Sequence, residues 1–251
     1  MKTPNFRVDG RRALVTGAGR GIGLAAAHAL AQAGAVVTLA ARTAAELERA
    51  CAAINSAGGR AQAWAVDVTD SRAVAAGVAE RGPFQILVNN AGMNRPRLIT
   101  ETSDTDLDDV LNLNVKATFY VAREVARGLL AQGLSGSMIN ISSQMGHVGG
   151  PKRTVYCATK HAVEGLTKAL AWELGPSGIR VNTLCPTFIE TELTKPMFSD
   201  QVFRNYVTSR IALGRLGTLE DVMGAVTFLA SDAAALITGS ALMVDGGWTA
   251  A

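Results

Sequence analysis

A phenol and an ammonium group stand four residues apart in this sequence, at Tyr156 and Lys160. They begin an apolar-periodic segment, so on a helix both side chains would lie on one face. A phenol has a pKa of about 10, and a fixed cation beside it stabilises the phenolate and lowers that pKa. Lowering the pKa to about 7 takes roughly 4 kcal/mol, which we expect from Lys160 together with a positively charged cofactor ring. The pair therefore predicts a general acid–base site, with Tyr156 as the group that exchanges a proton with substrate.

A hydroxyl for the same site is offered by Ser142 and Ser143, which follow a strand-like run at 137–141. Either serine can donate a hydrogen bond to a reacting oxygen. The glycines and proline at 149–151 then let the chain turn before the helix that carries Tyr156. A tyrosine and a lysine at this spacing are also typical of an ordinary surface pair, so the interpretation depends on the rest of the chain.

A glycine-rich loop at 17–23 lies between a predicted strand, 13–16, and a predicted helix, 24–33. A second strand at 36–41 completes a βαβ unit. The glycines allow positive φ angles and the close approach of a pyrophosphate, which binds exposed N–H groups at the positive end of the helix dipole. The unit therefore predicts a dinucleotide site, although a glycine loop alone is also compatible with a plain tight turn.

Strands and helices alternate along the rest of the chain. Strands are predicted at 13–16, 36–41, 61–66, 86–88, 137–141, 178–185 and 241–244. Helices are predicted at 24–33, 43–57 with Thr43 as the N-cap, 71–80, 154–174 and 218–231, and the segment 103–132 carries two helical patterns. This order predicts an α/β fold: a doubly wound, mostly parallel seven-stranded sheet of the Rossmann type, in three αβα layers, as one domain over residues 1–251.

Composition excludes several classes of protein. The chain has 251 residues, 48% of them hydrophobic, and a formal charge of +3 without a long run of Lys and Arg, which argues against nucleic-acid partners. The three cysteines are widely spaced and the three histidines show no metal-ligand spacing, so we expect no disulfide framework, no metal and a cytoplasmic location. The N-terminus lacks the apolar core of a signal peptide, and no apolar stretch predicts a membrane span.

Further motifs follow in a fixed order. They are Thr-Gly-Ala-Gly-Arg-Gly-Ile-Gly at 16–23, Asp67-Val68, Asn-Asn-Ala-Gly at 89–92, Asn114, Ser143, Tyr156 with Lys160, Pro186, and Val-Asp-Gly-Gly at 244–247. Across residues 8–248 the chain resembles the short-chain dehydrogenase/reductase family in its single-domain form. That resemblance implies a nicotinamide-dependent oxidoreductase that assembles as a homotetramer.

The resemblance also assigns roles to residues. It implies a catalytic set of Asn114, Ser143, Tyr156 and Lys160, with Ser143 favoured over Ser142 by its distance from the tyrosine. Asn114 is implied to hold a water behind the lysine, although an asparagine inside a helix also commonly satisfies a backbone group. The expected cofactor contacts are Gly17, Arg20, Gly21, Ile22, Gly23, Arg42, Asp67, Val68, Asn90, Gly92, Tyr156, Lys160, Ile189 and Thr191. For Asp67 a structural role remains open, as a cap of the helix at 71 or as part of a turn.

The segment after Pro186 predicts a lid. Residues 186–210 read as irregular, with Pro, Phe, Met and Tyr scattered through them, and we expect the lid to span about 187–215. The family covers its substrate with this region. The chain departs from the family here, because Thr187 replaces a glycine and leaves the backbone beside the nicotinamide uncertain.

The end of the second strand predicts NADP(H) in preference to NAD(H). A site selective for NAD commonly places a carboxylate there, but this chain has Ala41 followed by Arg42, whose guanidinium can bind a 2′-phosphate. Arg20 in the glycine loop offers a second positive charge. The alternative is that Arg42 is solvated and Arg20 only neutralises the pyrophosphate, which leaves NAD(H) open.

The predicted function is hydride transfer between a nicotinamide and a small-molecule alcohol or carbonyl compound, with a small polyol, sugar or keto acid as substrate. A 3-ketoacyl thioester on an acidic carrier protein is the rival substrate, with Arg123 and Arg127 as a docking patch. A non-catalytic dinucleotide-binding regulator is the alternative from another class. The loop residues Arg95, Lys152 and Arg153 indicate an anionic or hydroxyl-rich substrate unless they are solvated, and His147 is either a pocket wall or a solvated loop residue.

Overall fold

The computed structural model describes residues 1, 3–192 and 194–250. Its strands form one parallel sheet of seven in the order β3-β2-β1-β4-β5-β6-β7. Their bounds are β1 Arg12–Thr16, β2 Val36–Ala41, β3 Arg60–Ala65, β4 Ile86–Asn89, β5 Gly136–Ile141, β6 Ile179–Pro186 and β7 Ala241–Val244. The strand order reverses between β1 and β4, and ligands of doubly wound sheets bind at the carboxyl ends of strands at such a switch point. The predicted fold class is confirmed.

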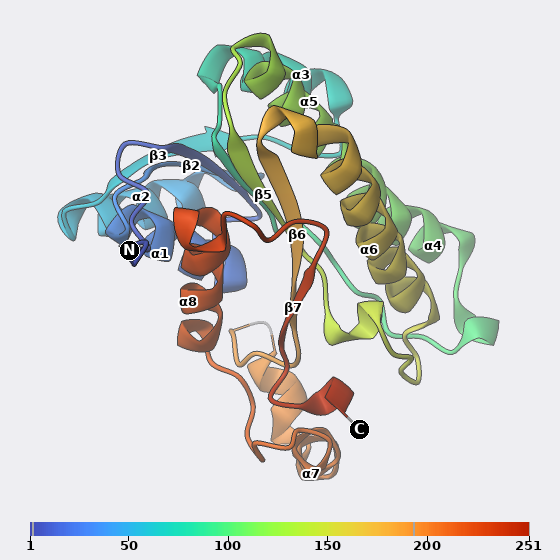
Figure 1. Ribbon diagram of the computed structural model, residues 1–251. Coiled ribbons are helices and arrows are strands. Elements are labelled where there is room, and N and C mark those ends of the chain that lie inside the picture. Colours follow the sequence, from blue (N-terminus) through green and yellow to red (C-terminus); the bar gives the residue numbers. More distant parts are fainter. Residues whose placement is uncertain (2, 193, 251) are drawn as a thin grey trace.

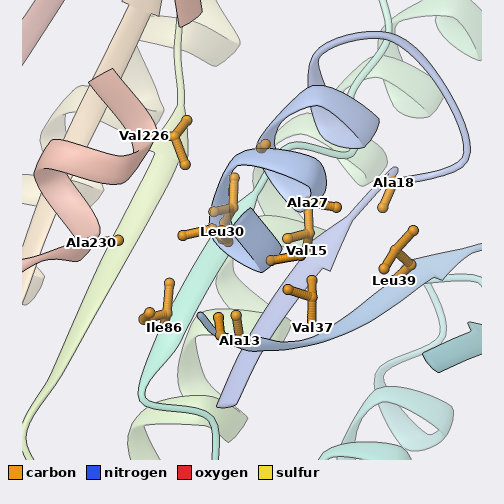
Figure 2. Packing of buried hydrophobic residues seen from close by; sticks show 14 of the residues in the cluster. Ala13, Val15, Ala18, Ala27, Leu30, Val37, Leu39, Ile86, Val226 and Ala230 are labelled. Atoms are coloured by element: carbon orange, nitrogen blue, oxygen red, sulfur yellow. The ribbon is translucent and has the colours of Figure 1, made fainter. Parts of the chain in front are cut away.

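Two helical layers cover the sheet (Figure 1). One face carries α1 Gly21–Gln32, α2 Ala44–Ser56 and α8 Leu219–Ala230, and the other carries α3 Ser71–Arg81, α4 Asp104–Leu111, α5 Thr118–Ala131 and α6 Thr154–Leu174. A π-helical segment, Asn112–Ala117, joins α4 to α5. Alternate residues of each strand enter opposite layers: Val15 of β1 belongs to one core cluster and Leu14 to the other. Figure 2 shows the first of these clusters, with Val15 beside Leu30 of α1. The sheet therefore has a hydrophobic core on each face, and these two cores hold the ends of the strands in place.

Most predicted elements agree with the structure to within a few residues. Thr43 does stand at the N-cap of α2, but its side chain makes no capping hydrogen bond. The N-cap of α3 is Asp70, whose carboxylate accepts from the backbone N–H groups of Arg72 and Ala73 at 2.9 and 3.1 Å. Asp67 is therefore not the cap of this helix.

The prediction that residues 186–210 are irregular is wrong. They contain a short 3-10 segment, Lys195–Ser199, and the helix α7 Gln201–Ser209, which lies beyond the carboxyl ends of β6 and β7 (Figure 1). Asp200 caps α7 by accepting from Val202 and Phe203 N–H at 2.9 and 3.3 Å. Phe188 packs edge-on against Phe198 and Phe203, so an aromatic cluster joins this segment to the sheet. Leu193 lies outside the described residues.

Among the described residues, no helix is both long enough and apolar enough to cross a lipid bilayer.

Candidate active site

The glycine loop joins β1 to α1 at the switch point. Gly17 and Gly21 have positive φ angles of 62° and 57°, which side-chain-bearing residues rarely adopt. A Cβ at Gly17 would lie 2.9 Å from Asn90 Nδ2, and one at Gly23 would lie 2.4 Å from Gly17 O. Ile22 and Gly23 form the first turn of α1, which contains no acidic residue and no side-chain cap. The loop thus leaves a side-chain-free cradle at a helix N-terminus, which fits a pyrophosphate.

Asn90 holds this loop in place from the neighbouring strand. Its side-chain amide donates to Thr16 O at 3.0 Å and to Gly17 O at 3.1 Å, and its backbone N–H donates to Thr16 Oγ1 at 3.0 Å. Asn90 therefore positions the cradle itself, in addition to the ribose contact that the family implies. Gly92 follows in the same strand-end segment, where a Cβ would approach Asn114 Oδ1 to 3.2 Å.

The predicted acid–base residues converge at the carboxyl end of β5. Tyr156 and Lys160 share one face of α6, and the Lys160 ammonium lies 5.5 Å from the centre of the Tyr156 ring. Lys160 Nζ donates a 2.7 Å hydrogen bond to Ile141 O, so it is anchored to the strand that leads into Ser143. Ser143 is close enough to Tyr156 for its hydroxyl to lower the pKa of the phenol, whereas the Ser142 hydroxyl is buried without a hydrogen-bond partner. This geometry supports the choice of Ser143.

The expected pKa of Tyr156 is not reached by the protein alone. Burial raises the pKa of Tyr156 to about 12, and Ser143 and Arg153 offset only part of that rise. Burial also lowers the pKa of Lys160 to about 8, because the desolvated ammonium is disfavoured. A pKa of Tyr156 near 7 therefore requires the positive charge of a bound nicotinamide in addition to Lys160.

Asn114 lies in the π-helical segment between α4 and α5. Its side chain accepts from Met93 N–H at 2.8 Å and donates to Met93 O at 2.9 Å and to Thr159 Oγ1 at 3.1 Å. The predicted structural role, satisfying a backbone group, is thus present. The same contacts hold the segment after β4 against α6, beside Lys160, where the family places its water.

The adenosine end of the cradle carries the expected charges. Arg42 and Arg20 are exposed, the first directly after β2 and the second before α1. Hydrogen bonds from Thr69, with a smaller contribution from Arg42, hold the pKa of Asp67 below its usual value. Asp67 Oδ1 accepts hydrogen bonds from the Thr69 N–H and hydroxyl at 2.9 and 2.7 Å. Asp67 therefore does close a turn, and these two hydrogen bonds use one of its carboxylate oxygens. Val68 is buried beside it.

The far side of the cradle is formed by residues that follow β6. A Cβ on Gly21 would lie 3.8 Å from Thr191 Cγ2, so Thr191 stands over the glycine loop. Ile189 is buried and forms an isolated bridge with Gly217. Thr187 does not have the left-handed backbone that would require the family's glycine, and its N–H donates to Val244 O at 3.2 Å. Its hydroxyl is buried without a hydrogen-bond partner.

The structure adds two buried polar residues to the predicted catalytic set. Gln144 Oε1 accepts a hydrogen bond from the Ser143 hydroxyl at 2.6 Å, and nothing in its sequence position indicated that contact. Arg153, which indicates an anionic or hydroxyl-rich substrate unless it is solvated, is buried at the N-cap of α6 and close enough to lower the pKa of Tyr156. Arg95 is already paired with Asp106 and Asp109, each at 2.6 Å.

Two loops beside the acid–base residues are joined by a backbone hydrogen bond. Arg97 N–H donates to Lys152 O at 3.2 Å and so joins the loop after β4 to the loop before α6. Lys152 adopts a positive φ of 59°, the one such non-glycine residue in the described chain. Arg153 is therefore presented by a constrained turn.

Fold and site together define a dinucleotide-dependent oxidoreductase. A family model described as enoyl-(acyl carrier protein) reductase matches residues 17–249. The chain is 42% identical over 248 residues to gluconate 5-dehydrogenase of Gluconobacter oxydans, covering 97% of this chain and 96% of that protein. It is likewise 42% identical over 248 residues to D-erythrulose reductase of Gallus gallus, covering 98% of each. The crystal structure of a gluconate 5-dehydrogenase from Burkholderia cenocepacia J2315 in complex with NADP and tartrate superposes with a TM-score of 0.95 at 37% identity, covering 99% of both chains. The chain belongs to the short-chain dehydrogenase/reductase family.

Proposed function

We propose that this protein is an NADP(H)-dependent oxidoreductase that interconverts a secondary alcohol and a ketone on a small sugar acid, sugar or polyol. One observation carries the proposal: Tyr156, Lys160 and Ser143 converge beside a side-chain-free dinucleotide cradle. The two gluconate dehydrogenases and the erythrulose reductase among the relatives support the substrate class.

The glycines, Tyr156 and Ser143 have different roles in this reaction. Gly17, Gly21 and Gly23 hold the pyrophosphate of the dinucleotide, which when bound supplies or accepts a hydride. Tyr156 donates its phenolic proton to the carbonyl oxygen in reduction and removes the alcohol proton in oxidation. Ser143 donates a hydrogen bond to that oxygen as it gains negative charge, which stabilises the transition state more than the ground state.

Lys160 and Asn114 lie behind the reacting groups, where they supply protons and position the cofactor. Lys160 stabilises the phenolate and, anchored on Ile141 O, holds the nicotinamide ribose. Asn114, hydrogen-bonded to the Met93 backbone and Thr159, completes a proton path through water. Turnover on a panel of sugars, sugar acids, cyclic ketones and acetoacetyl thioesters tests the assignment, and activity confined to the thioester would refute it.

The two arginines expected to dock an acidic acyl-carrier protein are already engaged within the chain. Arg123 and Arg127 both pair with Glu124, at 2.7 and 3.0 Å, and Arg123 also lies over the rings of Phe119 and Tyr120. Paired arginines offer little free charge to an acidic carrier protein.

Arg153 favours a sugar acid within the proposed class. The residue is buried and burial lowers the pKa of its guanidinium, yet its one hydrogen bond is a long contact of 3.4 Å to Lys152 O and no carboxylate of the described residues pairs with it. A buried unpaired cation is costly, and an anionic ligand would offset that cost. Because Arg153 lies near Tyr156, a substrate carboxylate bound to it would bring a nearby hydroxyl to the phenol.

Arg153→Met is expected to raise the KM for a sugar acid about 10- to 150-fold, the loss of one charge-assisted hydrogen bond worth roughly 1.5–3 kcal/mol. The KM for a neutral ketose should change far less. Steady-state kinetics on both substrates measures the difference, with Arg95→Met as the control because Arg95 is engaged by two aspartates. An equal rise for both substrates would show that Arg153 supports the fold and not the carboxylate.

We further propose a cytoplasmic homotetramer. The free cysteines suit a reducing compartment. The solvent-exposed face of α6 carries a stripe of small and apolar residues, namely Ala158, Ala162, Gly165, Ala169 and Trp172. Small residues let helices approach closely, and Trp172 is 86% exposed in the single chain, which is unusual for so large an apolar side chain. A second copy packing α6 against α6 would bury this stripe.

Trp172→Glu should therefore split the tetramer into smaller species at micromolar concentration, because the charge enters the apolar contact between the two copies of α6. Light scattering after size exclusion measures the mass. Ala52→Glu on exposed α2 adds the same charge elsewhere and should leave the tetramer intact. A monomeric parent protein would contradict the assembly outright.

A further inference from the structure

Three residues with metal-binding side chains meet behind the catalytic serine. His147 follows the Ser143 turn, Glu164 lies one helical turn after Lys160 on α6, and Cys185 lies near the end of β6. His147 Nε2 is 3.3 Å from Glu164 Oε1, Cys185 Sγ is 3.3 Å from the same oxygen, and Sγ is 3.6 Å from Nε2. Their separation in the chain gives no metal-ligand spacing, which is why the sequence predicts no such site.

These separations match a tetrahedral zinc site. Zinc binds thiolate sulfur at about 2.3 Å and imidazole nitrogen or carboxylate oxygen at about 2.0–2.2 Å. Tetrahedral angles then place the nitrogen and oxygen roughly 3.3 Å apart, and the sulfur roughly 3.6 Å from either. The three donor atoms already lie near these distances, so binding requires little rearrangement.

Ser142 offers a further oxygen beside this cluster. Its hydroxyl is buried and has no hydrogen-bond partner. A Cβ on Gly146 would lie 2.8 Å from Ser142 Oγ and 3.3 Å from Glu164 Oε1, so both oxygens face the same gap. A buried hydroxyl without a partner costs free energy, and a cation in this gap would remove that cost.

The outer contacts also suit a metal. The Thr183 hydroxyl donates to Glu164 Oε2 at 2.9 Å, which orients the carboxylate and leaves Oε1 for the ion. His147 is the accessible ligand, with 32% of its side chain exposed, and offers an entry path. We propose that His147, Glu164 and Cys185, with the Ser142 hydroxyl or a water as fourth ligand, form a structural zinc site.

Charge and protons balance in this site. A thiol must lose its proton to bind zinc, so binding releases the Cys185 proton to solvent, forms the zinc–sulfur bond and displaces water from the ion. The thiolate and the carboxylate then neutralise the two positive charges of zinc.

The position of the site indicates what the ion would do. Its ligands come from the turn after Ser143, from the helix that carries Lys160 and from the strand that leads into the lid. Zinc would join these three elements behind the acid–base residues without touching substrate. We therefore expect it to stabilise the folded protein and to limit motion of the Ser143 turn.

Cobalt provides a direct test, since a thiolate–cobalt bond gives a near-ultraviolet charge-transfer absorption. Chelator-treated protein is titrated with Co²⁺, then with Zn²⁺ as competitor, and its thermal midpoint is measured with and without Zn²⁺. We expect one ion per chain, displacement of cobalt by zinc and a higher midpoint with zinc. Cys185→Ser should remove the charge-transfer band, and His147→Gln, on an accessible turn, should weaken zinc binding at least tenfold without risk to the core.

Matched controls use the same residue types elsewhere. Cys51→Ser and His161→Gln should bind cobalt and zinc like the parent, because neither side chain reaches the cluster. The proposal is wrong if the parent shows no thiolate–cobalt band, or if Cys185→Ser and His147→Gln bind zinc as tightly as the parent. The three groups would then be a hydrogen-bonded network only. Neither result bears on the oxidoreductase activity, which the substrate panel tests separately.

Discussion

Replacing Tyr156 with Phe should lower kcat for ketone reduction by about 10²- to 10⁴-fold, the range that positioned general acids contribute. The substitution removes only the hydroxyl and leaves the ring packed on α6. Burial keeps the pKa of Tyr156 high, so the phenol is fully protonated at neutral pH and ready to donate. Dinucleotide affinity should change little, because the glycine cradle and Lys160 remain.

The measurement pairs steady-state kinetics with a direct titration of dinucleotide. Tyr120→Phe on α5 is the matched control, since it removes a phenol that packs on Phe119 and Arg123. It should keep near-parental turnover. Activity of Tyr156→Phe within tenfold of the parent would remove Tyr156 from the acid–base role and leave the proton donor to another group.

Much of the scaffold was predictable because local pattern and global fold agree. The strand, glycine loop and helix at 13–33 combine a buried strand, positive-φ glycines and an apolar helix, each of which indicates the same unit. Parallel strands buried on both faces appear as short continuous apolar runs, as at residues 86–88 of β4. The four-residue spacing from Tyr156 to Lys160 places both on one face of a helix without any tertiary information.

The sequence predictions that the structure contradicts concern features that depend on tertiary contacts. Asp200 was available as a capping signal for α7, but the helix also needs Phe188 of another segment to cover Phe203. The pKa of Tyr156 was expected to fall because a neighbouring cation is visible in sequence, whereas the burial that raises it is not.

The alignment of His147, Glu164 and Cys185 follows from the packing of α6 on β6 and was equally hidden. The sequence groups Arg153 with Arg95 and Lys152 as loop cations that indicate an anionic substrate, but it does not predict that Arg153 alone of the three is buried. In each case the sequence gives the chemical type of the side chain, whereas its burial and its neighbours depend on the tertiary structure.

The cofactor preference is expected to be for NADP(H) and to depend on Arg42. Arg42 is exposed directly after β2, and its charge reaches Asp67 at the neighbouring strand end, where the adenosine should lie. Arg20 is exposed at the other side of the glycine loop. Charge-assisted bonds to a 2′-phosphate worth roughly 1.5–3 kcal/mol give about 10- to 150-fold preference in affinity. The relative crystallised with NADP is consistent with this preference.

Ala41→Asp combined with Arg42→Ile should reverse the preference. The new carboxylate accepts hydrogen bonds from a ribose 2′-hydroxyl and repels a 2′-phosphate, while loss of the guanidinium removes the attraction. The decisive quantity is kcat/KM with each cofactor for the parent and the double variant. Arg49→Ile on the exposed face of α2 removes a charge outside the cradle and should leave the ratio unchanged. A parent that uses NAD(H) equally well or better would show that Arg42 is solvated and that the phosphate is not recognised at this strand end.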